Sequence, residues 1–182
     1  VRIYVVGAGE WRGYEAFPPP ATSTRYYLRA AGRLEAAPPA TDEPPDRYRY
    51  DPADPTPAAG GAVLAMRGAG PVDNRALEAR DDVLCYTTEP LAEDLEIIGP
   101  VRLDLHAASS LASTDFFGRL CDVAPDGEST NVCDGLARVA IGGGQAGWGD
   151  GRRVEVDLWW AAHCFRAGHR LRLQVSSGAH PR

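Results

Sequence analysis

The sequence contains no lysine, and all 19 of its basic residues are arginine. Its 182 residues include 25 acidic ones, which gives a formal net charge of −6. This acidic balance argues against a nucleic acid or an anionic membrane as the partner. The sequence also lacks any apolar run of the ~18 residues that a membrane-spanning helix needs, so we expect no membrane segment.

The N-terminus lacks the features of a secretory signal, which are a basic region, a long apolar stretch and a cleavage site. The chain starts with Val1-Arg2-Ile3-Tyr4-Val5-Val6-Gly7, without methionine and already in an extended pattern. We therefore expect a piece cut from a longer polypeptide, and we expect that polypeptide to be cytoplasmic.

No Cys-x-x-Cys pair is present, although the chain has four cysteines. They are widely spaced, as expected for buried, reduced thiols rather than for a metal or redox site. The one disulfide that we consider is Cys121–Cys133, across a hairpin. The four positions are Cys85, Cys121, Cys133 and Cys164.

Metal and cofactor patterns are missing as well. The histidines His106, His163, His169 and His180 lie in separate segments without the helical spacing of a zinc site. Asp122, Asp126 and Asp134 could flank a calcium loop, but the sequence has no Asp-x-Asp-x-Asp-Gly pattern. Gly7-Ala8-Gly9 lacks the third glycine of a dinucleotide-binding turn. We therefore predict no metal ligands and no cofactor.

The sequence has no Gly-x-Ser-x-Gly elbow to expose a nucleophilic serine, because Gln174 stands where the first glycine would precede Ser176. Ser176, Ser177 and His180 are close in sequence but follow a regular strand pattern instead of a strained turn. We predict that none of them is catalytic, and we assign no catalytic residue to this chain.

Period-two alternation of apolar and polar residues is the clearest positive signal, and it recurs at residues 101–107, 153–158 and 170–176. Such alternation is typical of antiparallel strands with one buried and one solvated face. Weaker strand patterns occur at residues 2–6, 24–29, 82–88, 115–123 and 136–141. About eight strands with turn-rich connections predict an all-β fold, a single jelly-roll β-sandwich over residues 1–182.

Turn residues agree with this fold. Pro125-Asp126-Gly127 predicts a tight reversal between strands, because proline presets φ and glycine permits positive φ. Ala167-Gly168-His169 separates the last two strand patterns. Residues 75–80 alone suggest a helical turn, and residues 142–147 read as a flexible glycine-rich loop.

Residues 35–81 form a proline-rich excursion that cannot be a central strand, because proline removes backbone donors. A loop of this length inside a compact domain is usually functional or interdomain, or else disordered. Tyr48 and Tyr50 offer two rings that could pin it to a surface. We expect an ordered arm that wraps its own sandwich and reaches a neighbour.

Two adjacent tryptophans, Trp159 and Trp160, follow the strand pattern of residues 153–158. Neighbouring residues of a strand point to opposite faces, so we expect Trp160 inside and Trp159 outside. An indole on a wet face is either a platform for a ligand such as a sugar or is covered by another protein surface. We favour the covered surface, and Tyr48, Tyr50 and Trp159 are the candidate interdomain or ligand-binding residues.

Four blocks of sequence, in order, resemble the C-terminal domain of the X-Pro dipeptidyl-peptidase family, which includes cocaine-esterase-like (CocE/NonD) acyl hydrolases. The first block is residues 48–57 with Gly60-Gly61 and residues 70–75, and the second is residues 82–91 running into residues 98–101. The third joins Thr114-Asp115-Phe116 to residues 122–127, and the fourth is residues 165–173 with residues 175–177 and Pro181. The resemblance extends over nearly the whole chain.

The resemblance implies a jelly-roll sandwich of the galactose-binding type that follows an α/β-hydrolase domain carrying a Ser-His-Asp triad. No triad position maps onto this sequence, so the implied role is an accessory domain that supports the catalytic domain and its substrate entrance. The hydrolase domain of the same polypeptide is the implied partner, and assembly into a homo-oligomer stays open. The family domain usually continues past the position of Arg182, which implies an incomplete domain here. A carbohydrate-binding module or a free-standing interaction domain remains the alternative.

Overall fold

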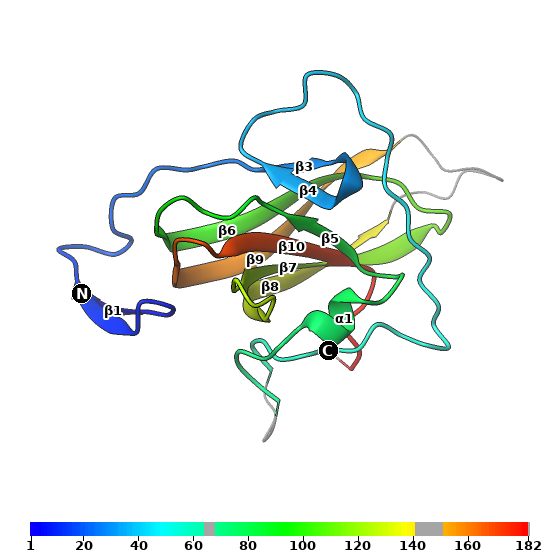
Figure 1. Ribbon diagram of the computed structural model, residues 1–182. Helices are drawn as coiled ribbons and strands as arrows, with labels where there is room; N and C mark the ends of the chain where they lie inside the picture. The colour runs from blue at the N-terminus through cyan, green and yellow to red at the C-terminus, as the bar shows by residue number, and fades with distance from the viewer. Residues whose placement is uncertain (64–67, 141–150, 182) are drawn as a thin grey trace.

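The computed structural model describes residues 1–63, 68–140 and 151–181 (Figure 1). The regular secondary structure within them consists almost entirely of strands, which confirms the predicted class. The strands are β1 Arg2–Val5, β2 Glu10–Gly13, β3 Tyr27–Arg29, β4 Arg33–Glu35, β5 Leu84–Thr87, β6 Leu95–Ala107, β7 Ser113–Val123, β8 Ser129–Ala140, β9 Arg152–Phe165 and β10 Arg170–Ser176. The helical elements are the 3₁₀ turn η1 Ala30–Gly32 and the short helix α1 Arg75–Glu78. The predicted glycine-rich loop at residues 142–147 lies outside the described residues.

Two sheets enclose the core and form the sandwich. The larger one has the strand order β3-β4-β5-β10-β7-β8, and the smaller one pairs β6 with β9 (Figure 1). One cluster of buried side chains joins residues of both sheets: Leu34, Tyr86, Leu103, Leu105, Phe116, Leu120, Val154, Val156, Leu158, Phe165, Leu171, Leu173 and Val175. The three strong alternating patterns of the sequence supply more than half of this cluster, so their inward faces are confirmed. The jelly-roll and galactose-binding labels stay predictions.

The predicted reversals are confirmed. Pro125 and Gly127 lie in the turn of the β7–β8 hairpin, where the Gly127 amide donates to the carbonyl of Ala124 at 2.9 Å and Gly127 adopts a φ of 89°. Residues 167–169 connect β9 to β10, and α1 occupies the predicted helical turn.

Several strands differ from their predicted bounds. β6 begins at Leu95, before the alternating pattern of residues 101–107, and Gly99 and Pro100 lie inside it. A proline is tolerated there since β6 pairs with β9 alone among the described residues, and an edge strand leaves one row of amides unpaired. The short β2 and β4 were not predicted, because three or four residues are too few to show alternation.

β8 closes the sandwich against β9 at Gly135. A Cβ placed on this glycine would lie 1.9 Å from the carbonyl oxygen of Asp157, so no other residue fits without moving a backbone. The contact brings the edge of the larger sheet onto the smaller one.

The expected reduced thiols are confirmed, and Cys121 and Cys133, the one pair considered for a bridge, are not joined. Cys133 packs against the core between the sheets. Cys121 lies on the opposite face of β7, with its Sγ 3.2 Å from the Nε2 of Gln174, and all four cysteines are free. Burial raises the pKa of the Cys133 thiol to about 12, and burial also raises that of Cys121.

Candidate interdomain surface

Tyr48 and Tyr50 hold the arm against the end of β10. The hydroxyl of Tyr48 lies 2.7 Å from the Oγ of Ser177, and burial raises the pKa of this tyrosine. The ring of Tyr50 covers Gly178 so closely that an added Cβ would lie 3.0 Å from its Cε2 atom. The arm therefore wraps its own sandwich, as expected; its contact with a neighbour stays a prediction.

Polar side chains fix the middle of the arm. The hydroxyl of Tyr86 donates to Asp46 at 2.8 Å, and the hydroxyl of Thr56 donates to Asp82 at 2.6 Å. Arg80 pairs with the same Asp82 at 2.7 Å. The first contact joins the arm to β5, and the other two fasten it to the segment just before β5, which explains how a proline-rich segment stays ordered without pairing as a strand.

A buried ion pair lies beneath the far part of the arm. Arg119 of β7 and Asp134 of β8 are 2.8 Å apart, and their side chains are 1% and 2% exposed. Arg119 also donates to Asn74 at 2.7 Å and to the backbone carbonyl of Ala59. These contacts pair the two terminal nitrogens of a guanidinium that would otherwise be costly to bury, while its Nε is buried without a partner among the described residues.

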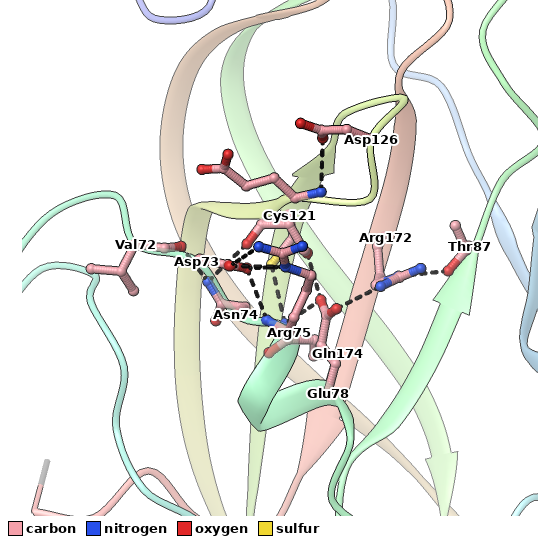
Figure 2. Close-up of polar contacts among 12 residues, drawn as sticks. Val72, Asp73, Asn74, Arg75, Glu78, Thr87, Cys121, Asp126, Arg172 and Gln174 are labelled. Carbon is pink, nitrogen blue, oxygen red and sulfur yellow. Dashed lines mark hydrogen bonds and ion pairs between the residues drawn. The ribbon is translucent and has the colours of Figure 1, made fainter.

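Helix α1 adds a second polar cluster, drawn in Figure 2. Glu78 accepts hydrogen bonds from Arg172 at 2.5 Å, from Gln174 at 2.9 Å and from Ser129 at 2.5 Å. Arg172 continues to the hydroxyl of Thr87 at 2.8 Å (Figure 2). One carboxylate thus ties the helix to β8 and β10.

A cluster of Asp122 with two histidines was not predicted from the sequence. Nε2 of His163 and Nδ1 of His169 each lie 2.8 Å from a different oxygen of this carboxylate. Burial tends to raise the pKa of Asp122, but the bonds to the histidines outweigh it and the pKa is lowered. No spacing in the sequence shows this cluster, because β7, β9 and the β9–β10 turn supply one residue each.

The serines and the histidine near the C-terminus form no catalytic arrangement among the described residues. Ser176 donates to the carbonyl of Gly178 at 3.0 Å, and Ser177 contacts Tyr48. His180 pairs through its backbone with the arm. All of these contacts stabilise the strand end and the arm.

The three aspartates considered for calcium lie apart. Asp122 binds the histidines, Asp134 pairs with Arg119, and Asp126 accepts from the amide of Glu128 at 3.0 Å in the hairpin turn. Within the part of the chain that the structure describes, no cluster of three metal-ligating side chains is present.

Both tryptophans are exposed, so the prediction of a buried Trp160 is wrong. Trp159 is 68% exposed and Trp160 is 49% exposed. A β-bulge is the reason: two residues of β9, Leu158 and Trp159, stand between the partners of Arg102 and Pro100 in β6. The core-facing series therefore passes from residue 158 to residue 161, and both indoles point away from the core.

An aromatic surface results on the outer side of β9, and we define it as Phe17, Trp159 and Trp160. The ring of Phe17, 57% exposed, lies 5.1 Å from that of Trp160 at an interplanar angle of 35°. Trp159 adopts a φ of 71°, and its amide donates to the carboxylate of Asp157 at 2.9 Å.

Comparison with known proteins identifies the family. The family described as "X-Pro dipeptidyl-peptidase C-terminal non-catalytic domain" matches residues 1–182. The chain belongs to this family. The family is by its description a C-terminal, non-catalytic domain, which agrees with the accessory role that the resemblance implied.

The relatives are longer proteins. The cocaine esterase of Rhodococcus sp. (strain MB1 Bresler) is 37% identical over 197 residues, which cover 100% of this chain and 34% of the esterase. A solved aminopeptidase from a marine sediment Thaumarchaeota archaeon superposes with a TM-score of 0.85 at 27% identity, over 99% of this chain and 33% of that chain. An α-amino acid ester hydrolase superposes with a TM-score of 0.77 at 26% identity, over 99% and 34%. The chain spans about a third of the length of each of these proteins.

No helix among the described residues is long and apolar enough to cross a membrane.

Proposed function

We propose that residues 1–182 serve a longer serine hydrolase of the acyl-ester or X-Pro peptide class as its accessory β-sandwich. The family assignment carries this proposal, because the family is by description a non-catalytic C-terminal domain. The relatives whose names state an activity act on esters or peptides. The polar contacts of Ser176, Ser177 and His180 support it further, since each is explained by the fold alone.

The domain's role in this proposal is mechanical: it holds the catalytic domain of the same polypeptide and shapes the substrate entrance. An arm fixed by buried charge pairs and shared carboxylates is suited to this role, because such contacts have fixed directions. Tyr48 and Tyr50 contribute by fixing the arm, and Trp159 contributes as an exposed ring. The polypeptide is cytoplasmic in this proposal.

Assays of the native polypeptide on an X-Pro anilide and on a short acyl ester test the proposal, with Ser176→Ala and Ser177→Ala as variants. We expect turnover of one of the two substrates, and a change of kcat/KM of less than about twofold in either variant, because neither hydroxyl touches substrate. Turnover abolished by either substitution would contradict the proposal, as would a native polypeptide that hydrolyses neither substrate.

A further inference from the structure

The aromatic surface is built at a conformational cost. Trp159 occupies the left-handed region at a φ of 71°, where a bulky side chain is rare. The bulge that places it there also turns Trp160 outward, against the alternation of a regular strand. A regular β9 would bury one of the two indoles, so the consequence of the bulge is that both are exposed.

The chemistry of this surface suits another protein better than a sugar. One face of the Trp160 ring already packs against Phe17, and the exposed Pro100 lies opposite Trp160 in β6. The carboxylate of Asp157 accepts the amide of Trp159. A sugar site needs polar groups placed around a free ring face to bind the hydroxyls, whereas tryptophan and phenylalanine side by side are typical of protein interface centres.

The occupant that the observations favour is the catalytic part of the same polypeptide. The matched family is by description C-terminal, so in its members the catalytic part precedes this domain and joins it through the N-terminal segment. That segment supplies Phe17 to the aromatic surface. The chain spans about a third of the length of its relatives, so the rest of such a polypeptide is large enough to cover the surface.

We infer that the catalytic part of the polypeptide docks on Phe17, Trp159 and Trp160, and that the bulge at Trp159 presents the two indoles to it. This inference rests on the proposed function. The docked surface excludes water from both indoles and anchors the centre of the interdomain contact.

Hydroxyl-radical footprinting of the native polypeptide, read by mass spectrometry, tests the inference. Oxidation rates of Trp159 and Trp160 are compared with the rates in the urea-unfolded protein. We expect both indoles to be protected in the native state at every protein concentration. Rates as fast as in urea would overturn the inference; the proposed function would still stand if the same preparation hydrolyses its ester or peptide.

A double variant, Trp159→Ser with Trp160→Ser, supplies a second readout in the native polypeptide. We expect limited proteolysis to separate the domains roughly tenfold faster than in the wild type, because the anchors of the contact are lost. Leu111→Ser is the control, since Leu111 is an apolar residue of similar exposure, 60%, in the loop after β6. Equal rates in the double variant and the control would overturn the inference. Protection that disappears on dilution, or that requires an added galactoside, would also overturn it.

Discussion

The two outer faces of the sandwich differ in how they are covered. The outer face of β7, β8 and β10 is covered by the arm and α1, and it buries Arg119, Asp134 and Gln174 beneath them. The outer face of β9 exposes Trp159 and Trp160 to solvent. One face is thus completed within the chain by polar contacts, while the other displays apolar rings.

The difference bears on which surface meets a partner. The arm face is covered within the chain, whereas an exposed indole keeps the free energy high until another surface removes it from water. The arm side should therefore determine the stability of the domain, and the aromatic side should determine its association.

Breaking the buried pair is the strongest test of the arm side. Asp134→Ala leaves the guanidinium of Arg119 buried without its carboxylate, so we expect the free energy of unfolding to fall by about 3–5 kcal/mol. The matched control is Asp104→Ala, which removes an exposed partner of Arg153 and should cost less than about 1 kcal/mol. Urea unfolding of both variants measures the difference; similar losses would refute the contrast between buried and exposed pairs.

The closure of the sandwich at Gly135 can be tested separately. Gly135→Ala places a methyl group against the carbonyl of Asp157, and we expect a loss of about 2–3 kcal/mol as β8 and β9 move apart. Gly99→Ala is the control, because no atom lies within 4 Å of a Cβ built there. A tolerated Gly135→Ala in thermal unfolding would show that the strands do not approach as described.

The carboxylate between the two histidines predicts a pH dependence. The folded pKa of Asp122 lies below its ordinary value of 3.8, so its bonds stabilise the fold above that pH and the contribution is lost as the pH falls through the folded pKa. We expect Asp122→Asn to cost about 1–3 kcal/mol near pH 7 and progressively less in more acid solution. Parallel stability curves for wild type and variant, from pH 7 down to pH 2, would contradict this account of Asp122.

The smallest effect belongs to the aromatic side and has the opposite sign. In residues 1–182 Trp159→Gly relieves the positive φ without exposing core, and we expect a gain of about 1 kcal/mol. Trp160→Gly, which relieves no such strain and loses the contact with Phe17, should instead lose about 0.5–1 kcal/mol. Urea unfolding of the two variants measures both changes. A lower free energy of unfolding in both variants would show that the bulge at Trp159 holds no strain.

The sequence predicted correctly those features that depend on the residues of a single strand or turn. Alternation located the inward faces of β9 and β10, and Pro125 with Gly127 located the hairpin turn. The strand pattern of residues 115–123 is weaker because both faces of β7 are covered: Phe116 lies in the core, and on the other face Arg119 donates to Ala59 of the arm.

The sequence was misleading or silent wherever the result depends on two distant strands. The bulge at Trp159 arises from the register of β9 against β6, and it reversed the predicted orientation of Trp160. The cluster of Asp122 with His163 and His169 depends on three elements meeting. The sequence alone did not show why the considered Cys121–Cys133 bridge is absent, which is that the two thiols lie on opposite faces of the sheet. In each case the deciding fact is a contact that no local pattern encodes.

In the proposed function this sandwich supports a hydrolase and cleaves no bond itself. Labelling the native polypeptide with a fluorophosphonate, followed by peptide mapping of the modified serine, tests it most directly. We expect a single labelled serine, outside residues 1–182. A label on Ser176 or Ser177 would contradict it.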